Sequence, residues 1–250
     1  MTENPYTPPE AALFGGGSVP PKTKAPGLME QIEGVFTAPV ELFKKLHDTP
    51  SWAPAFTLAL VFIFIMLLVW SFRVDADAFL RPIMERNPKV PADQIDTIIG
   101  IQKKFLFLSA VFAPVGAAIG MFLMGLIYWG LGIAFAEDAK PTYTQSLVAS
   151  TVPGLVTIPW MLLITVLCLL KGPVTIAPER VAPTSLGYFM ATENLKLSAF
   201  LFSLDLFAIA SWVLTFLACR HALRMKPLGA FLCTAIVVLI SVGFKVIGAK

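Results

Sequence analysis

The chain has 250 residues, of which 56% are hydrophobic and only 14% are charged. Soluble domains carry about 25% charged residues, so this deficit indicates a protein that lies in lipid. The formal net charge of +3 is too small to argue for nucleic acid as a partner. The composition therefore favours an integral membrane protein whose first partner is the bilayer.

The first segment, residues 1–27, is rich in Pro and Gly and includes the run Gly15–Gly16–Gly17. A segment of this composition has too few large apolar residues to bury a core. We expect a disordered tail here.

Residues 28–49 form an amphipathic segment. Apolar residues recur there at helical spacing, with charged residues elsewhere on the wheel. Pro39 is expected to divide the segment into two short helices, because proline lacks the backbone N–H that a helix interior needs. Two interpretations stay open: an interfacial helix lying in the headgroup plane, or a helix docked on the protein's own membrane domain.

Residues 50–250 carry five apolar runs long enough to cross a bilayer, which takes roughly 20 helical residues. The predicted spans are 53–72, 107–135, 146–170, 197–218 and 228–248. They predict an all-α, polytopic helical bundle. The first run exceeds the apolar core of about 7–15 residues found in signal peptides, so we interpret it as an uncleaved signal anchor.

Trp52 and Trp70 stand at the two ends of the first span, where aromatic side chains typically anchor a helix at the membrane interface. We place the N-terminus in the cytoplasm, because no translocation signal precedes the polar tail and the densest short basic loop, 219–227, then lies inside. The total Lys and Arg count leans mildly the other way.

Gly116 and Gly120 form a GxxxG pattern in the second span, which lets two helix backbones approach closely. We expect them to serve helix packing inside the bundle rather than a dedicated dimer face.

Few residues offer chemistry. His47 and His221 match no zinc-binding pattern, and Asp75 and Asp77 form a DxD that is most simply the start of a solvated loop. No catalytic residue, cofactor or metal site is expected. The cysteines, none in a CxxC pattern, are expected to be free thiols; they are Cys168, Cys219 and Cys233.

Asp205 is the one acidic residue within a predicted span, and a carboxylate at that depth costs roughly 2.5–3.5 kcal/mol on insertion scales. Ser198 and Trp212 lie seven residues to either side and would share its helical face. A buried carboxyl is either protonated or paired. We interpret Asp205 and Ser198 as an intramembrane polar contact. Hydroxyl partners on other spans would be Ser109, Tyr128, Ser150, Thr157 and Thr165.

Two stretches carry a family resemblance. "GVFTAPVELFKKLHDTPSWAPAF", 34–56, resembles the opening of the bacterial branch of the Yip1 family, and "LSAFLFSLDLFAIASWVLTFLACRHALRMKPLGAF", 197–231, resembles its fourth span and following turn. The resemblance covers about residues 34–248 and implies five spans, a cytosolic N-terminal region and a multi-pass place in a bacterial inner membrane. Asp205 matches the family's Asp-Leu-Phe position, for which no catalytic role is established.

The eukaryotic members of that family bind small GTPases, but this chain lacks their Asp-Leu-Tyr-Gly-Pro motif, so GTPase binding is not expected. The leading functional hypothesis is a non-catalytic membrane scaffold or interaction protein that contacts other membrane proteins or itself and organises the membrane. The alternative is a transporter or channel subunit with Asp205 in a polar path. A lipid-modifying enzyme comes third and would need polar groups converging near Asp75, Asp77 or His221.

Overall fold

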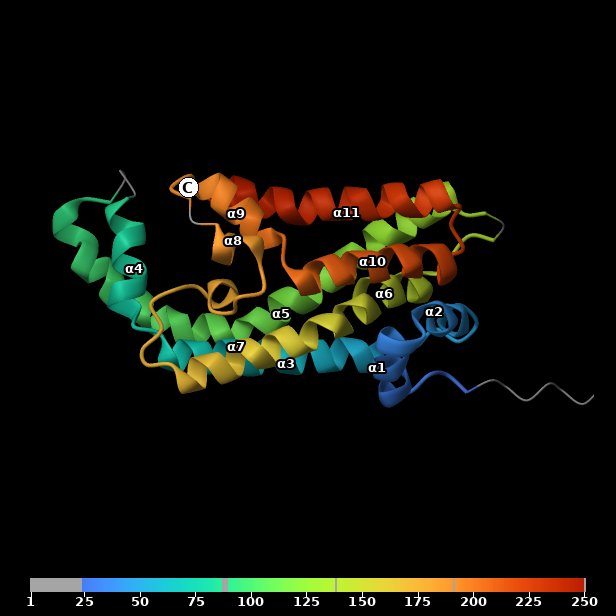
Figure 1. Ribbon diagram of the computed structural model, residues 1–250, viewed down its shortest axis with the longest axis horizontal. Helices are drawn as coiled ribbons and strands as arrows, with labels where there is room; N and C mark the ends of the chain where they lie inside the picture. The colour runs from blue at the N-terminus through green and yellow to red at the C-terminus, as the bar shows by residue number, and fades with distance from the viewer. Residues whose placement is uncertain (1–23, 87–89, 138, 191, 250) are drawn as a thin grey trace, which may run out of the picture.

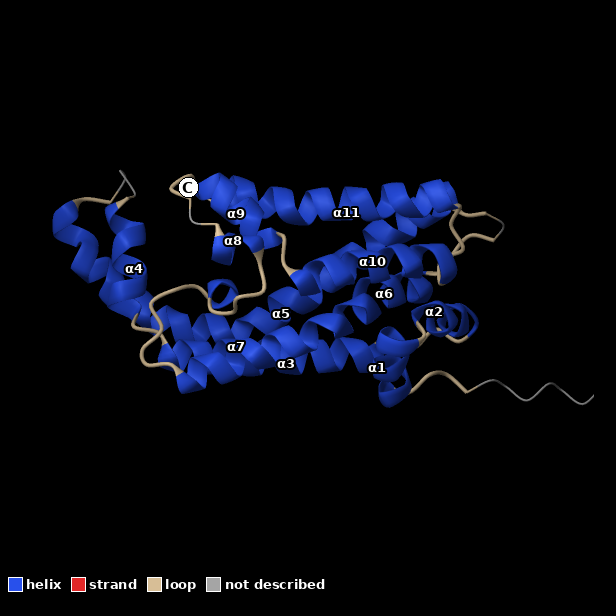
Figure 2. Ribbon diagram, viewed as in Figure 1, coloured by secondary structure: helices blue, strands red, loops and turns tan. Residues whose placement is uncertain are grey.

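The computed structural model describes residues 24–86, 90–137, 139–190 and 192–249, so most of the expected tail at 1–27 lies outside the described residues. Within these ranges the regular elements are helices, joined by loops and isolated bridge pairs (Figure 2). The all-α class predicted from the sequence is confirmed.

The α-helices are α1 (Leu28–Thr37), α2 (Pro39–Asp48), α3 (Ala53–Arg73), α4 (Ala76–Glu85), α5 (Ile95–Phe135), α6 (Tyr143–Thr151), α7 (Ile158–Leu170), α8 (Leu186–Phe189), α9 (Leu195–Ser203), α10 (Leu206–His221) and α11 (Pro227–Gly248). Short 3₁₀ turns are η2 (Ala92–Gln94), η3 (Val152–Thr157) and η4 (Pro178–Arg180).

Four helical segments of the described chain are long and apolar enough to cross a membrane, and they lie along one another in an elongated bundle (Figure 1). They are Ala53–Arg73, Ala92–Phe135, Tyr143–Leu170 and Pro227–Gly248, and the shorter apolar helix α10 lies beside them. The polytopic bundle is therefore confirmed. Its side chains that face outward are largely apolar, as helices surrounded by lipid require.

The second segment is much longer than a bilayer is thick. It covers 44 residues, or about 66 Å of helix against a hydrocarbon layer of about 30 Å. Its N-terminal part therefore projects beyond the bundle, where α4 packs against it through the buried side chains of Leu80, Ile95 and Ile99 (Figure 1).

The third segment bends at two prolines and is the most deeply buried of the four. Pro153 is the second residue of the 3₁₀ turn η3 and Pro159 is the second residue of α7, so the helix changes geometry where a proline would break its hydrogen-bond ladder. Val148 and Val152 have no exposed surface. The main core forms here, where α6 and η3 meet α2 and α10.

The amphipathic segment is two helices divided at Ala38 and Pro39, as the proline predicts. Phe43 and Leu46 of α2 are fully buried in the main core. These contacts dock the α1–α2 pair on the protein's own membrane domain, at the opposite end of the bundle from α4 (Figure 1). A headgroup-facing role for its exposed residues stays a prediction.

Candidate functional site: the helix break at Asp205

The expected single helix over 197–218 is wrong, because the chain is broken at Leu204 and Asp205 into α9 and α10. Asp205 is not in the middle of a helix but caps the start of α10. Its Oδ1 accepts hydrogen bonds from the backbone N–H groups of Phe207 at 2.8 Å and Ala208 at 3.3 Å. A carboxylate is well suited to this position, since the first N–H groups of a helix have no partner within it.

The rest of the break is closed by the loop that follows α7. Leu206 N–H donates to the carbonyl of Thr184 at 3.1 Å, and Leu186 N–H donates to the carbonyl of Leu204 at 3.1 Å. The Thr184 hydroxyl also donates to the second carboxylate oxygen of Asp205. The two segments thus pair like a short piece of antiparallel sheet, with the bridge between Ser185 and Asp205. This pairing satisfies the backbone groups that an interrupted helix exposes in lipid.

The break lies well inside the bundle. Asp205 shares a cavity with Thr157 and Trp160, and Trp160 precedes the last residue of α7, Leu170, by ten residues. That separation corresponds to about 15 Å along the helix, or half of a typical hydrocarbon layer.

This cavity, the Asp205 cavity, has a volume of about 200 Å³ and brings three ionisable side chains together: Glu179, Asp205 and Lys245. Asp205 itself is 8% exposed. The indole N–H of Trp160, also on the cavity wall, has no hydrogen-bond partner among the described residues. The space is polar enough to hold water, which ordinarily satisfies such buried donors.

The polar partners expected from the sequence are mostly not those observed. Ser198 lies in α9 whereas Asp205 caps α10, so the two do not share a helical face. Ser198 is buried and accepts a hydrogen bond from Arg180 at 3.4 Å. Of the hydroxyls proposed on other spans, Thr157 lines the cavity, whereas Ser109 and Thr165 bond to carbonyls of their own helices. The side chain that partners Asp205 is Thr184, in the loop after α7 and outside the predicted spans.

The GxxxG pattern does not mark a contact in the described structure. A Cβ added at Gly116 or Gly120 would meet no atom within 4 Å, so the expectation of internal packing there is wrong. Close approaches occur at other glycines, where an added Cβ would lie within 2.7 Å of a neighbouring side chain; these are Gly125, Gly132, Gly187 and Gly229.

The two tryptophans at the ends of α3 behave differently. Trp52 stays partly exposed and makes edge-to-face contacts with Phe56 and Phe122, so its role as an interface anchor stays a prediction. Trp70 is only 7% exposed, and its indole N–H donates to the carbonyl of Ile176 at 3.1 Å. Trp70 therefore fastens a loop inside the protein and is not a lipid-facing anchor.

The other residues considered for catalysis or metal binding mostly make structural contacts. Asp75 caps α4 by accepting from two backbone N–H groups, and Asp77 pairs with Lys103. His47 contacts the carbonyl of Ala222 at 2.8 Å. Asp75 and Asp77 lie at the start of α4 and His221 ends α10. The start of α4 and the end of α10 lie at opposite ends of the bundle, so these groups do not converge (Figure 1).

The cysteines are free thiols, as expected, and all are buried. The sulfur atoms of Cys219 and Cys233 lie 3.7 Å apart between α10 and α11.

An elongated, all-helical bundle with several bilayer-length apolar helices and a break closed by a loop defines a multi-pass integral membrane protein. The family model of the Yip1 domain matches residues 34–247, nearly the whole chain, so the protein belongs to the Yip1 family. Comparisons with curated proteins and with solved structures gave no match.

Proposed function

We propose that this chain is a non-catalytic scaffold or interaction protein of the membrane. The observation that carries the proposal is the bonding of Asp205, whose carboxylate accepts from two N–H groups of α10 and from the Thr184 hydroxyl. A side chain with these hydrogen bonds has a structural role, since it holds the start of α10 and the loop at Thr184 together.

The surface open to other molecules supports an interaction role. On α1, outside the docked face, Met29 is 76% and Phe36 is 53% exposed. The opposite face of this helix pair is anchored in the core, so these two large apolar side chains point outward. They form a contact point for another membrane protein, a second copy of the chain or the headgroup layer.

Photo-cross-linking tests the interaction role in native membranes. A benzophenone side chain placed at Met29 or Phe36 is expected to give discrete protein adducts, and the same probe at the buried Phe43 is expected to give only intramolecular ones. If neither exposed position yields a protein adduct, the interaction role fails.

A transporter or channel subunit is the second candidate, because the Asp205 cavity brings the charged side chains of Glu179 and Lys245 toward Asp205, which lies at membrane depth. The packing toward the α2 end argues against a continuous path. One turn before Trp160, Val156 is 8% exposed, and further along α10, Leu214 is 6% exposed, so the cavity meets a closed core on that side.

Reconstituted liposomes separate the two functions. The scaffold proposal predicts no ion or proton flux above protein-free vesicles at any pH. A pH-dependent flux that Asp205→Asn abolishes would instead establish transport through the Asp205 cavity.

A further inference from the structure

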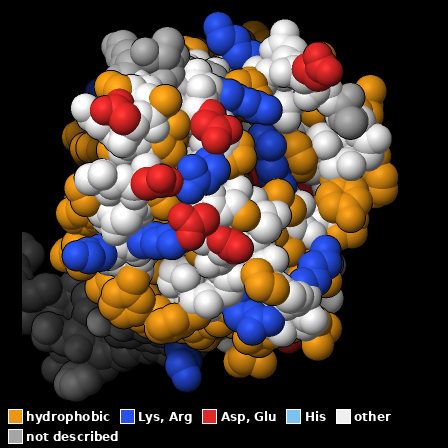
Figure 3. All heavy atoms as spheres, turned by 90° about the vertical axis from the view of Figure 1, so that its left-hand side faces the viewer, with side chains coloured by type: hydrophobic (Ala, Val, Ile, Leu, Met, Phe, Trp, Pro, Cys, Tyr) orange, Lys and Arg blue, Asp and Glu red, His pale blue; other side chains and the backbone are white. Residues whose placement is uncertain are grey.

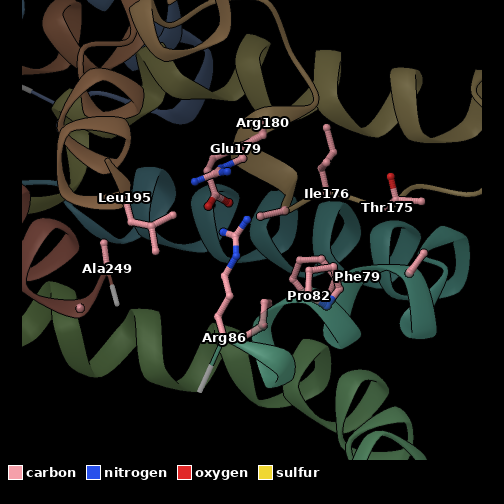
Figure 4. Close-up of a pocket in the computed structure, with 13 residues that line it drawn as sticks. Phe79, Pro82, Arg86, Thr175, Ile176, Glu179, Arg180, Leu195 and Ala249 are labelled. Carbon is pink, nitrogen blue, oxygen red and sulfur yellow. The ribbon is translucent and has the colours of Figure 1, made fainter. Parts of the chain in front are cut away.

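A second and larger cavity, of about 380 Å³, opens at the end of the bundle where α4 meets the loop after α7 (Figure 4). We call it the surface cavity. Its apolar wall on α4 is formed by Phe79, Pro82 and Ile83, and Ile176 and Leu195 line it from other elements.

The charged side chains of the surface cavity carry a positive excess. Arg86 and Arg180 line it against a single carboxylate, that of Glu179. Figure 4 shows the guanidinium of Arg86 reaching from the end of α4 toward Glu179 and Arg180. Guanidinium groups bind phosphate and carboxylate oxygens through paired N–H donors, so this arrangement favours an anion.

Arg180 is held in place by its neighbours. Its guanidinium carbon lies 4.8 Å from the centre of the Phe202 ring, and one of its nitrogens is 3.4 Å from the Ser198 hydroxyl. A cation stacked on an aromatic face keeps its remaining N–H donors available and loses less freedom when an anion binds.

The surface cavity lies where the bundle meets the membrane surface. Its residue Ile176 accepts the hydrogen bond of Trp70, in the last turn of the bilayer-length helix α3. The neighbouring Val174 pairs with the end of the same helix, its N–H donating to the Arg73 carbonyl at 2.8 Å. The view onto this end shows charged side chains of both signs over the face with hydrophobic side chains at its rim (Figure 3).

We propose that the surface cavity binds the phosphate headgroup of an acidic phospholipid. Arg86 and Arg180 contact the phosphate, and the glycerol and upper acyl chains lie against the apolar wall of α4. Glu179 opposes the bound negative charge and limits the affinity. The proposal is independent of the scaffold role, because lipid retention reports on this cavity whether or not the chain also binds proteins.

Lipid titration of the full chain, followed by native mass spectrometry from detergent micelles, tests the proposal. Phosphatidylglycerol is expected to be retained more strongly than phosphatidylcholine. Arg86→Gln and Arg180→Gln should each weaken phosphatidylglycerol binding roughly fivefold, the effect of one basic side chain near a charged lipid surface. Glu179→Gln should strengthen it, an opposite sign that general loss of structure does not produce.

The matched control is Arg81→Gln. Arg81 also lies on α4 and is exposed, but its guanidinium is 2.7 Å from Asp96, and that hydrogen bond and charge raise the pKa of Arg81. Its loss changes the net charge equally and should leave lipid binding unchanged. If Arg81→Gln weakens binding as much as Arg86→Gln, only diffuse surface charge is involved and the proposal is overturned.

A competition arm separates a lipid from a soluble anion. Inorganic phosphate and glycerol phosphate, which lack acyl chains, should not displace phosphatidylglycerol at equal concentration, because they cannot use the apolar wall. If inorganic phosphate or glycerol phosphate displaces phosphatidylglycerol as well as added phosphatidylglycerol does, the cavity recognises free phosphate and the lipid proposal fails.

Discussion

Replacing Asp205 separates its capping role from its charge. In Asp205→Leu, the N–H groups of Phe207 and Ala208 lose their acceptor, as does the Thr184 hydroxyl. Loss of an N-cap costs about 1–2 kcal/mol, and an unpartnered hydroxyl adds about 1–3 kcal/mol. The free energy of unfolding should therefore fall by about 2–5 kcal/mol in total.

Asp205→Asn is the matched variant. Its side-chain oxygen can accept from the same two N–H groups, and its amide can donate to the Thr184 oxygen, so stability should stay within about 1 kcal/mol of the parent. Thr184→Val, which removes the hydroxyl alone, should fall between the two.

Unfolding in mixed micelles, with SDS as denaturant and tryptophan fluorescence as readout, measures all three variants. The cap argument is refuted if Asp205→Leu is as stable as the parent. It is equally refuted if Asp205→Asn falls as far as Asp205→Leu, because the negative charge itself would then be required and a functional ion site would explain the residue better.

Three further predictions concern packing and docking. Gly187→Ala should destabilise the protein by about 1–3 kcal/mol, because the new Cβ would lie 2.6 Å from the Phe202 ring and 2.8 Å from its backbone nitrogen. Gly116→Ala, with open space around it, should leave the melting temperature unchanged or higher; a drop would show that this face packs against a partner. Gln31→Leu should cost about 1–2 kcal/mol and expose α1 to limited proteolysis, because the fully buried Gln31 donates to the Ser51 carbonyl at 2.8 Å. Unchanged cleavage would contradict its role in docking.

The sequence predicted the parts of the fold that depend on local information. The bilayer-length helices follow from apolar runs, and the division of the first amphipathic segment follows from Pro39. The break at Asp205 is not evident from the sequence, because Asp205 is the one charged residue in a run from 197 to 218 that is otherwise apolar or small and polar. Its partner Thr184 lies 21 residues away. An Asp before an apolar helical run is also an N-cap signal, and interpreted in that way Asp205 would have predicted the observed role.

Contacts between helices were less accessible from the sequence. A GxxxG pattern shows that a close approach is sterically allowed, but not which face of α5 turns toward a neighbour; Gly125 does so and Gly116 does not. In the same way, a tryptophan at a helix end suggests the membrane surface, whereas Trp70 bonds to a loop more than 100 residues further along the chain.

The pairing of residues 184–186 with 204–206 constrains how the chain enters the bilayer. Residues 184–186 leave the ribosome before 204–206, so a template for the interrupted segment exists by the time that segment is made. We therefore expect α9 and α10 to insert stably only when residues 184–186 are in place. In an unrelated host protein, the segment 195–221 would leave polar backbone groups without partners in hydrocarbon.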